Sequence, residues 1–132
     1  MFEIKVDVRL YDTDAAGIVF FANYFRIAHD AYQVFMKSIG HGLDRIIGQS
    51  DYLLPIVHAE ADYKKPLVLG NTVTVSMKGQ VKDTSFLVSY TLKDGGGITV
   101  AQLQTVHVAM DKKTGKKIAL PEEIKKGLST IR

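Results

Sequence analysis

The segment at residues 23–39 constrains the fold more than any other part of the chain, because it reads as a helix with very little surface left for water. Its polar residues recur at helical spacing as one narrow stripe, and nearly every other position is apolar. Two glycines after residue 39 predict its end. Such a helix must be covered on most of its sides. The stripe consists of Arg26, Asp30, Gln33 and Lys37.

Most of the remaining chain predicts strands, because apolar and polar residues alternate along it. Residues 2–10 alternate strictly, and a tight connection at Asp83-Thr84 joins two more alternating segments. Residues 98–110 are apolar on much of both faces, which is typical of a central strand or of one that faces another subunit. The expected strands are 2–10, 54–64, 72–82, 85–93 and 98–110, and residues 121–128 are expected to form a short helix.

This order of elements limits the architecture. One flat sheet cannot bury so apolar a helix and also cover the last strand on both faces. We therefore expect an α+β fold in which a five-stranded antiparallel sheet wraps round one long central helix, as a single domain over residues 1–132. A second copy of the chain would cover what remains, so we expect a homo-oligomer, at least a dimer.

Composition excludes several classes of function. The chain has no cysteine, which excludes disulfides, a cysteine nucleophile and thiolate metal sites. Its four histidines form no HxH or HxxxH pair, so we expect no metal. No apolar run reaches the roughly 18–20 residues that cross a bilayer. The N-terminal residues alternate in charge, unlike a secretory leader, so we expect a cytoplasmic protein with no membrane partner.

Positive charge gathers in residues 111–132, which hold seven Lys or Arg residues against three acidic ones. Such a tail can attract a polyanion or a phosphorylated ligand, although a solvated Lys-rich edge is the simpler interpretation. Aromatic residues do not alternate with these lysines, and no nucleic-acid-binding motif is present, so we expect no nucleic-acid partner.

The candidate site lies in the loop before the helix, where Asp12 and Asp14 stand in an apolar stretch. No charged residue follows Asp14 until Arg26, which predicts a partly desolvated and more basic carboxylate. The helix start would supply free backbone N–H groups nearby, and Gly17 would let the chain approach a ligand. A carboxylate beside such donors suits acyl transfer.

Ordinary structural roles compete with this interpretation. An aspartate before a helix usually makes a turn or a cap, and Asp12 fits that role better than Asp14. Asn23 is more simply the N-cap of the helix than a substrate contact. His58, Glu60 and Asp62 share one face of a strand, where they could line a cleft, but an exposed polar face is the simpler interpretation.

Two further histidines, His29 and His107, are expected to be packed structural residues. The familiar alternatives for hydrolysis are absent, because the chain has no GxSxG, GxGxxG or Walker A motif.

The run from Asp12 to Tyr24 matches the pattern D-x-D-x-x-G-[IV]-V-x-x-x-N-Y nearly completely and resembles the 4-hydroxybenzoyl-CoA thioesterase family of hotdog proteins. The resemblance implies a sheet curled round one helix, with active sites at a dimer interface and often a tetramer. It implies that Asp14 is the catalytic carboxylate and that the backbone N–H of Phe21 polarises the thioester carbonyl. Whether the carboxylate attacks carbon or activates water stays open.

Other positions look more like 1,4-dihydroxy-2-naphthoyl-CoA hydrolases, notably Phe20-Phe21-Ala22-Asn23, Leu54-Pro55-Ile56 and Val106-His107-Val108. Many short-chain members carry His at the place of Phe21, and this chain departs from them. We therefore expect an aromatic acyl-CoA substrate. A short- or medium-chain acyl-CoA thioesterase, an acyl-ACP thioesterase and a non-catalytic acyl-CoA-binding module stay as alternatives.

The resemblance also implies where the substrate is held, with no cofactor beyond the CoA of the substrate itself. Its CoA contacts fall on the hairpin residues, and the lysines at 64, 65 and the C-terminal end are further candidates for the phosphates. The residues expected to contact the substrate are Gly17, Phe20, Asn23, His58, Lys82, Thr84 and Ser85.

Overall fold

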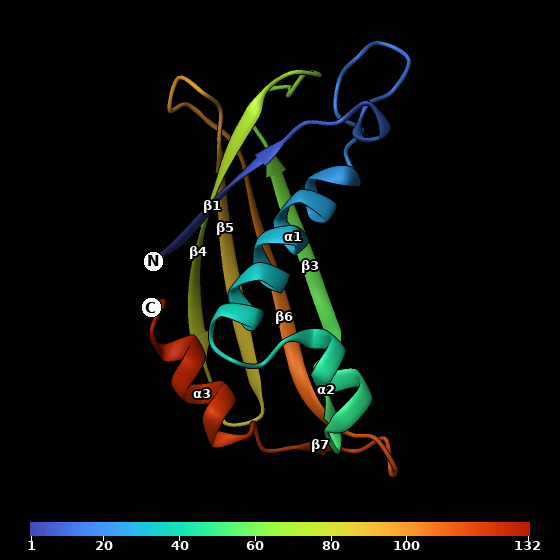
Figure 1. Ribbon diagram of the computed structural model, residues 1–132, viewed down its shortest axis with the longest axis vertical. Coiled ribbons are helices and arrows are strands. Elements are labelled where there is room, and N and C mark those ends of the chain that lie inside the picture. The colour runs from blue at the N-terminus through green and yellow to red at the C-terminus, as the bar shows by residue number, and fades with distance from the viewer.

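The computed structural model describes residues 1–132 and shows a curved antiparallel sheet packed against one long helix (Figure 1). The helices are α1 (Asn23–Ser38), α2 (Leu43–Gln49) and α3 (Glu122–Ser129), with a 3-10 turn at Leu10–Asp12. The strands are β1 (Phe2–Asp7), β2 (Tyr52–Leu53), β3 (Ile56–Tyr63), β4 (Thr72–Val81), β5 (Ser85–Lys93), β6 (Thr99–Asp111) and β7 (Lys117–Ile118).

Five long strands form the main sheet in the order β1-β4-β5-β6-β3, and every neighbouring pair is antiparallel. The short strands β2 and β7 pair with the C-terminal end of β6. The predicted five-stranded sheet round a central helix is therefore confirmed. The structure adds β2, β7 and α2, which the sequence interpretation left out.

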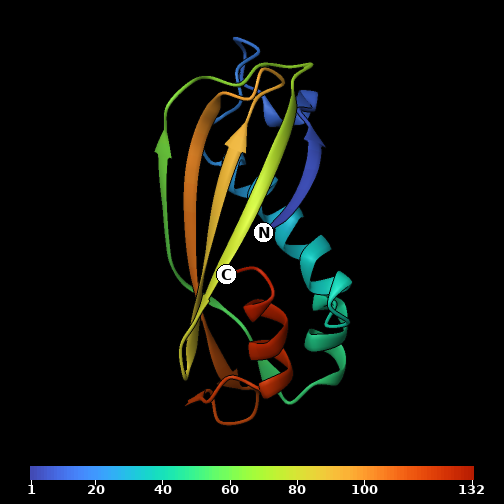
Figure 2. The same cartoon turned by 90° about the vertical axis from the view of Figure 1, so that its left-hand side faces the viewer.

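All three helices lie on the same face of the sheet, and its other face is uncovered (Figure 2). The apolar side of α1 faces the strands, and the resulting core holds 26 buried apolar residues. Fully buried side chains of α1 include Ile27, Ala31, Phe35 and Met36. At about 25 cal/mol per Å² of apolar surface, burial of such a face is what holds a helix of this length on a sheet.

The strand at residues 98–110 was expected to be central in the sheet or to face another subunit, and its central position is confirmed. Strand β6 is central in the sheet, between β5 and β3. Its inward side chains are buried, but the outward Gln102 is exposed and Val106 and Val108 are half-buried, because no helix covers that face.

Strand β3 forms one edge of the main sheet and pairs with β6 along one side only. Seven of its eight residues are exposed, including the apolar Ile56, Val57 and Tyr63. An exposed, apolar edge strand offers unpaired backbone groups to another strand.

None of the helices is long and apolar enough to span a membrane.

Candidate active site

The loop between β1 and α1 folds back on itself as a short hairpin. The Phe20 N–H donates to the Asp12 carbonyl at 3.0 Å, and the Asp14 N–H donates to the Ile18 carbonyl at 2.8 Å. Between these two bonds, Thr13 and Val19 form an antiparallel β-bridge. Gly17 closes the turn with a φ of +76°, a backbone conformation that favours glycine. The hairpin therefore holds Asp14 at its tip and delivers the chain into α1.

Asp14 is fixed by one of its two carboxylate oxygens. The N–H groups of Ala16 and Ile18 donate to Oδ1 at 2.8 and 3.3 Å, while Oδ2 has no hydrogen-bond partner. The residue is exposed in the single chain, so the predicted desolvation was wrong for one copy alone.

The same turn occurs a second time in the chain. At Asp94, Oδ1 accepts the N–H groups of Gly96 and Ile98, and Gly97 has a φ of +80°. The two aspartates differ in their second oxygen, because Oδ2 of Asp94 is paired with Lys65 Nζ at 3.1 Å. The turn accounts for one oxygen of Asp14 and leaves the other available for chemistry.

Asp12 anchors the hairpin to the helix from a fully buried position. Its two carboxylate oxygens accept Nε and Nη2 of Arg26 at 2.6 and 2.8 Å, and the Arg9 N–H adds a bond of 2.9 Å. Arg26 also binds Asp30 at 2.8 Å. Burial lowers the pKa of Arg26, but its bonds and charge attraction to Asp12 and Asp30 outweigh that effect and raise it. These contacts agree with a structural role for Asp12.

Asn23 does not cap the helix, so that expectation was wrong. The N-cap is Ala22, which has no side-chain capping bond, and Asn23 begins the helix. Its Nδ2 instead donates to the Asp12 carbonyl at 2.9 Å. The amide therefore ties the start of α1 to the hairpin.

The backbone at Phe21 presents an unpaired donor. The Asn23 N–H donates to the Phe20 carbonyl at 2.8 Å, which fixes the peptide plane between Phe20 and Phe21. Because N–H and C=O point in opposite directions in a trans peptide, the Phe21 N–H points away from the helix, and it makes no hydrogen bond within the chain. The next carbonyl, that of Phe21, accepts the Tyr63 hydroxyl at 3.0 Å.

A cavity of about 390 Å³ opens beside Phe21. Phe21 and Phe20 are exposed neighbours whose ring centroids lie 4.7 Å apart. Asp14 is not in the cavity wall, although its turn partner Ile18 is. The lining residues are Ile18, Val19, Phe21, Tyr24, Tyr63, Lys64, Lys65 and Pro66.

The expected CoA residues do not join this site in one chain. Lys82, Thr84 and Ser85 lie at the β4–β5 hairpin, at the opposite end of the sheet from the loop that holds Asp14 (Figure 1). Strand β4 alone separates the two ends by about 30 Å at 3.3 Å per residue. His58 lies on exposed β3, with its Nε2 3.3 Å from Glu60, as expected for a polar face.

His29 and His107 are packed, as expected. The His29 ring stacks on Tyr32 with centroids 5.3 Å apart, and the buried His107 ring stacks on Phe86 at 4.6 Å. Burial lowers the pKa of His107 to about 4, with the nearby His29 adding to the effect, so the ring is neutral at pH 7. No three His, Asp or Glu side chains lie where they could hold a metal ion together.

Sequence reasoning gave no role to Tyr63, which holds the Phe21 carbonyl from β3, 42 residues away in the chain. It placed Lys64 and Lys65 only among the secondary phosphate candidates. The only signal for these residues in the sequence is the segment Tyr63-Lys64-Lys65-Pro66. Its proline follows the strand and so indicates where β3 ends and a loop begins.

The fold and this site define a thioesterase of the hotdog type. A family model described as the thioesterase-like superfamily matches residues 8–128, and the chain belongs to that family. A 1,4-dihydroxy-2-naphthoyl-CoA hydrolase from Rippkaea orientalis is 35% identical over 126 residues, covering 93% of this chain and 91% of the relative. The resemblance seen in the sequence is thus confirmed.

Solved structures agree with this assignment. A 1,4-dihydroxy-2-naphthoyl-CoA thioesterase from Synechocystis superposes with a TM-score of 0.92 at 30% identity, over 97% of this chain and 95% of that one. A gentisyl-coenzyme A thioesterase superposes with a TM-score of 0.86 at 25% identity, over 96% of this chain and 99% of that one.

Proposed function

We propose that the chain hydrolyses the thioester of an aromatic acyl-CoA, with 1,4-dihydroxy-2-naphthoyl-CoA as the favoured substrate, to the free acid and CoA. The observation that carries this proposal is the pair of unused groups on one short segment, the Oδ2 oxygen of Asp14 and the N–H of Phe21. The named activities of the relatives support the choice of substrate.

The reaction needs only water and these two groups. The Phe21 N–H would bind the carbonyl oxygen and stabilise the negative charge that develops there. In one route Asp14 takes a proton from water, the resulting hydroxide attacks the carbonyl carbon, and collapse expels the CoA thiolate, which then receives the proton. In the other, Asp14 attacks carbon and expels the thiolate, and water then hydrolyses the anhydride. We propose no cofactor for either route.

For the CoA part, the cavity beside Phe21 supports Lys64 and Lys65 as contacts, because both line it. Ammonium groups are suitable partners for phosphate oxygens. Contacts from Lys82, Thr84 and Ser85 would require a second copy of the chain, since these residues lie at the far end of the sheet. A CoA thioester as substrate also supports a cytoplasmic location.

We propose that this second copy pairs along β3, with its strand antiparallel to the first. The free edge of β3 and its exposed Ile56 and Val57 support that arrangement. A two-fold axis across the edge would bring the far end of one subunit next to the near end of the other, so each site would contain residues of both.

The paired edge predicts the oligomeric state. Sedimentation of the wild-type chain should give at least twice the 14.6 kDa mass of one copy. Val57→Lys should shift it toward the monomer, because a charge on an edge strand opposes pairing. Val34→Lys is the matched control, since Val34 is also exposed but lies on α1. A monomeric wild type, or equal effects of the two variants, would contradict the proposal.

Thiol release from a panel of CoA thioesters tests the proposed activity. We expect 1,4-dihydroxy-2-naphthoyl-CoA to give the highest kcat/KM, ahead of 4-hydroxybenzoyl, benzoyl, short-chain and long-chain thioesters. Preference for a straight-chain thioester would move the substrate to that class. If no CoA ester reacts, the same acyl groups would be tested on ACP. Hydrolysis would then indicate an acyl-ACP thioesterase, and binding without turnover would indicate a binding module.

A further inference from the structure

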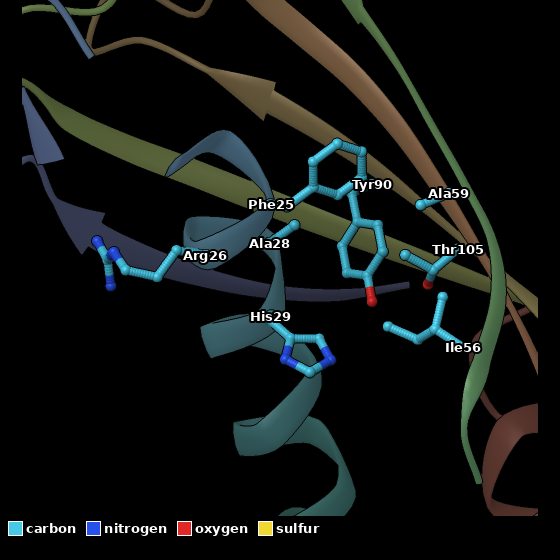
Figure 3. Close-up of a pocket in the computed structure, with 8 residues that line it drawn as sticks. All are labelled: Phe25, Arg26, Ala28, His29, Ile56, Ala59, Tyr90 and Thr105. Atoms are coloured by element: carbon cyan, nitrogen blue, oxygen red, sulfur yellow. The ribbon is translucent and has the colours of Figure 1, made fainter. Parts of the chain in front are cut away.

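A second cavity, of about 330 Å³, lies between α1 and β3, further along the helix than Phe21. Its volume falls within the roughly 300–1,000 Å³ typical of small-molecule sites. Figure 3 shows the Tyr90 hydroxyl pointing into the space between His29 and Ile56, while Arg26 points away from it. The lining residues are Phe25, Arg26, Ala28, His29, Ile56, Ala59, Tyr90 and Thr105.

A third cavity, also of about 330 Å³, continues this space toward α2. The two cavities share His29 and Ile56, which stand between them. The third is mostly apolar, and the rings of Tyr32 and His107 form part of its wall. The two adjoining cavities are here called the α1–β3 pocket.

Two hydroxyl groups in the wall of this pocket have no partner. Tyr90 and Tyr32 are 1% and 2% exposed, and the hydroxyl of neither makes a hydrogen bond. A buried hydroxyl without a partner typically costs about 1–3 kcal/mol, so native proteins rarely leave one unpaired without a reason. The arrangement indicates a place for an incoming polar group.

The two neighbouring polar side chains, His107 and Thr105, bond to one another. His107 Nδ1 lies 3.2 Å from the Leu54 carbonyl, which can only accept, so Nδ1 carries the proton of this neutral ring. Its Nε2 must then accept the hydrogen of the Thr105 hydroxyl, 2.9 Å away. The Thr105 oxygen can still accept a hydrogen bond, but neither tyrosine hydroxyl has a hydrogen-bond partner in the chain.

These hydroxyls keep their protons at any physiological pH. Burial raises the pKa of Tyr90, although the nearby Thr105 opposes the effect, and burial likewise raises the pKa of Tyr32. A neutral phenol can donate one hydrogen bond and accept another, which suits a ligand hydroxyl better than a carboxylate.

We propose that the α1–β3 pocket holds the acyl ring and that the Tyr90 hydroxyl recognises a hydroxyl substituent on it, with the Tyr32 hydroxyl deeper in the pocket. This inference rests on the proposed thioesterase function and adds Tyr90 as the residue that would set its preference for a ring hydroxyl. Phe25 in the pocket wall lies one helical turn, about 6 Å of rise, from Phe21, which places the pocket on the same helix as the N–H proposed to bind the thioester carbonyl.

The test compares a hydroxylated ring with a bare one, in binding and in turnover. Calorimetry under nitrogen would measure 1,4-dihydroxy-2-naphthoate against 2-naphthoate, and thiol release would compare their CoA esters. The wild type should favour the hydroxylated ligand at least tenfold in both measurements. Tyr90→Phe should reduce that preference below about threefold, chiefly by weakening the hydroxylated ligand. The matched control is Tyr52→Phe, since Tyr52 lines neither cavity.

The outcomes distinguish this inference from the proposed function on which it rests. A preference in binding that depends on Tyr90, without hydrolysis of any thioester, supports the pocket and overturns the proposed activity. Hydrolysis with an unchanged preference in Tyr90→Phe overturns the pocket and leaves the activity standing. Failure of the wild type to bind either acid also overturns the pocket. So does a fall in Tm beyond about 5 °C in Tyr90→Phe, because it would assign the hydroxyl to stability.

Discussion

Asp14→Asn is expected to lower kcat for thioester hydrolysis by about 10²–10⁴-fold, the range that a general base or nucleophile contributes. The amide oxygen of Asn can still accept the N–H groups of Ala16 and Ile18, so the turn is expected to survive. What is lost is the second oxygen, because an amide nitrogen can neither take a proton from water nor attack carbon. Stopped assays of thiol release with the preferred CoA ester would measure the effect.

The chain contains its own control for this experiment. Asp94 makes the same turn with the same pattern of N–H donors, so Asp94→Asn changes the same chemical group in the same local structure. Its kcat should stay within about twofold of the wild type. Circular dichroism and sedimentation should be unchanged in both variants. Near-normal turnover by Asp14→Asn would exclude Asp14 from the chemistry, and an equal loss in both variants would reduce its role to the turn.

The repeated turn shows what the sequence could and could not reveal about the site. The residues Asp14 to Ile18 and Asp94 to Ile98 both read as D-x-x-G-I, and local pattern alone predicts a turn at each. The difference lies in the partner of Oδ2, which at Asp94 is Lys65, 29 residues away. Contacts at such separations depend on strand pairing, which local sequence does not specify.

More of the fold than of the site could be predicted from the sequence, because the sequence signals for helices and strands are periodic. Alternation along the strands and the narrow polar stripe of α1 each reflect a buried face, and a sheet wrapped round that helix then followed from the need to cover it. The order of the strands within the sheet was not predicted. Helix α2 was missed although Leu43, Ile46 and Ile47 have helical spacing after Gly42. Its seven residues are too few for periodicity to stand out.

The α1–β3 pocket had no signal in the sequence. Tyr90 belongs to the apolar series of β5, at every second position with Val88 and Leu92, and is interpreted as an ordinary core residue. Tyr32 on α1 is interpreted in the same way. That their hydroxyls have no partner becomes visible only when the packing of α1, β3 and β6 is known.

Arg26→Met is expected to destabilise the fold by about 3 kcal/mol, the largest stability effect we predict for a single substitution outside the core. The substitution keeps the bulk of the side chain and removes the guanidinium that binds Asp12. Asp12 is fully buried and would keep only the Arg9 N–H, and an unpaired buried charge typically costs about 3–5 kcal/mol. The lower end applies here because Arg26 is itself 32% exposed.

A double-mutant cycle distinguishes this explanation from a simple loss of packing. Asp12→Asn in the Arg26→Met background removes the unpaired charge, so the double variant should be more stable to urea than Arg26→Met alone. The Asp12 carbonyl receives the N–H of Phe20 and the amide of Asn23, so displacement of Asp12 would also move the peptide that presents the Phe21 N–H. Arg26→Met should therefore lose kcat along with stability. An unfolding free energy within about 0.5 kcal/mol of the wild type would show that the ion pair does not hold the hairpin in place.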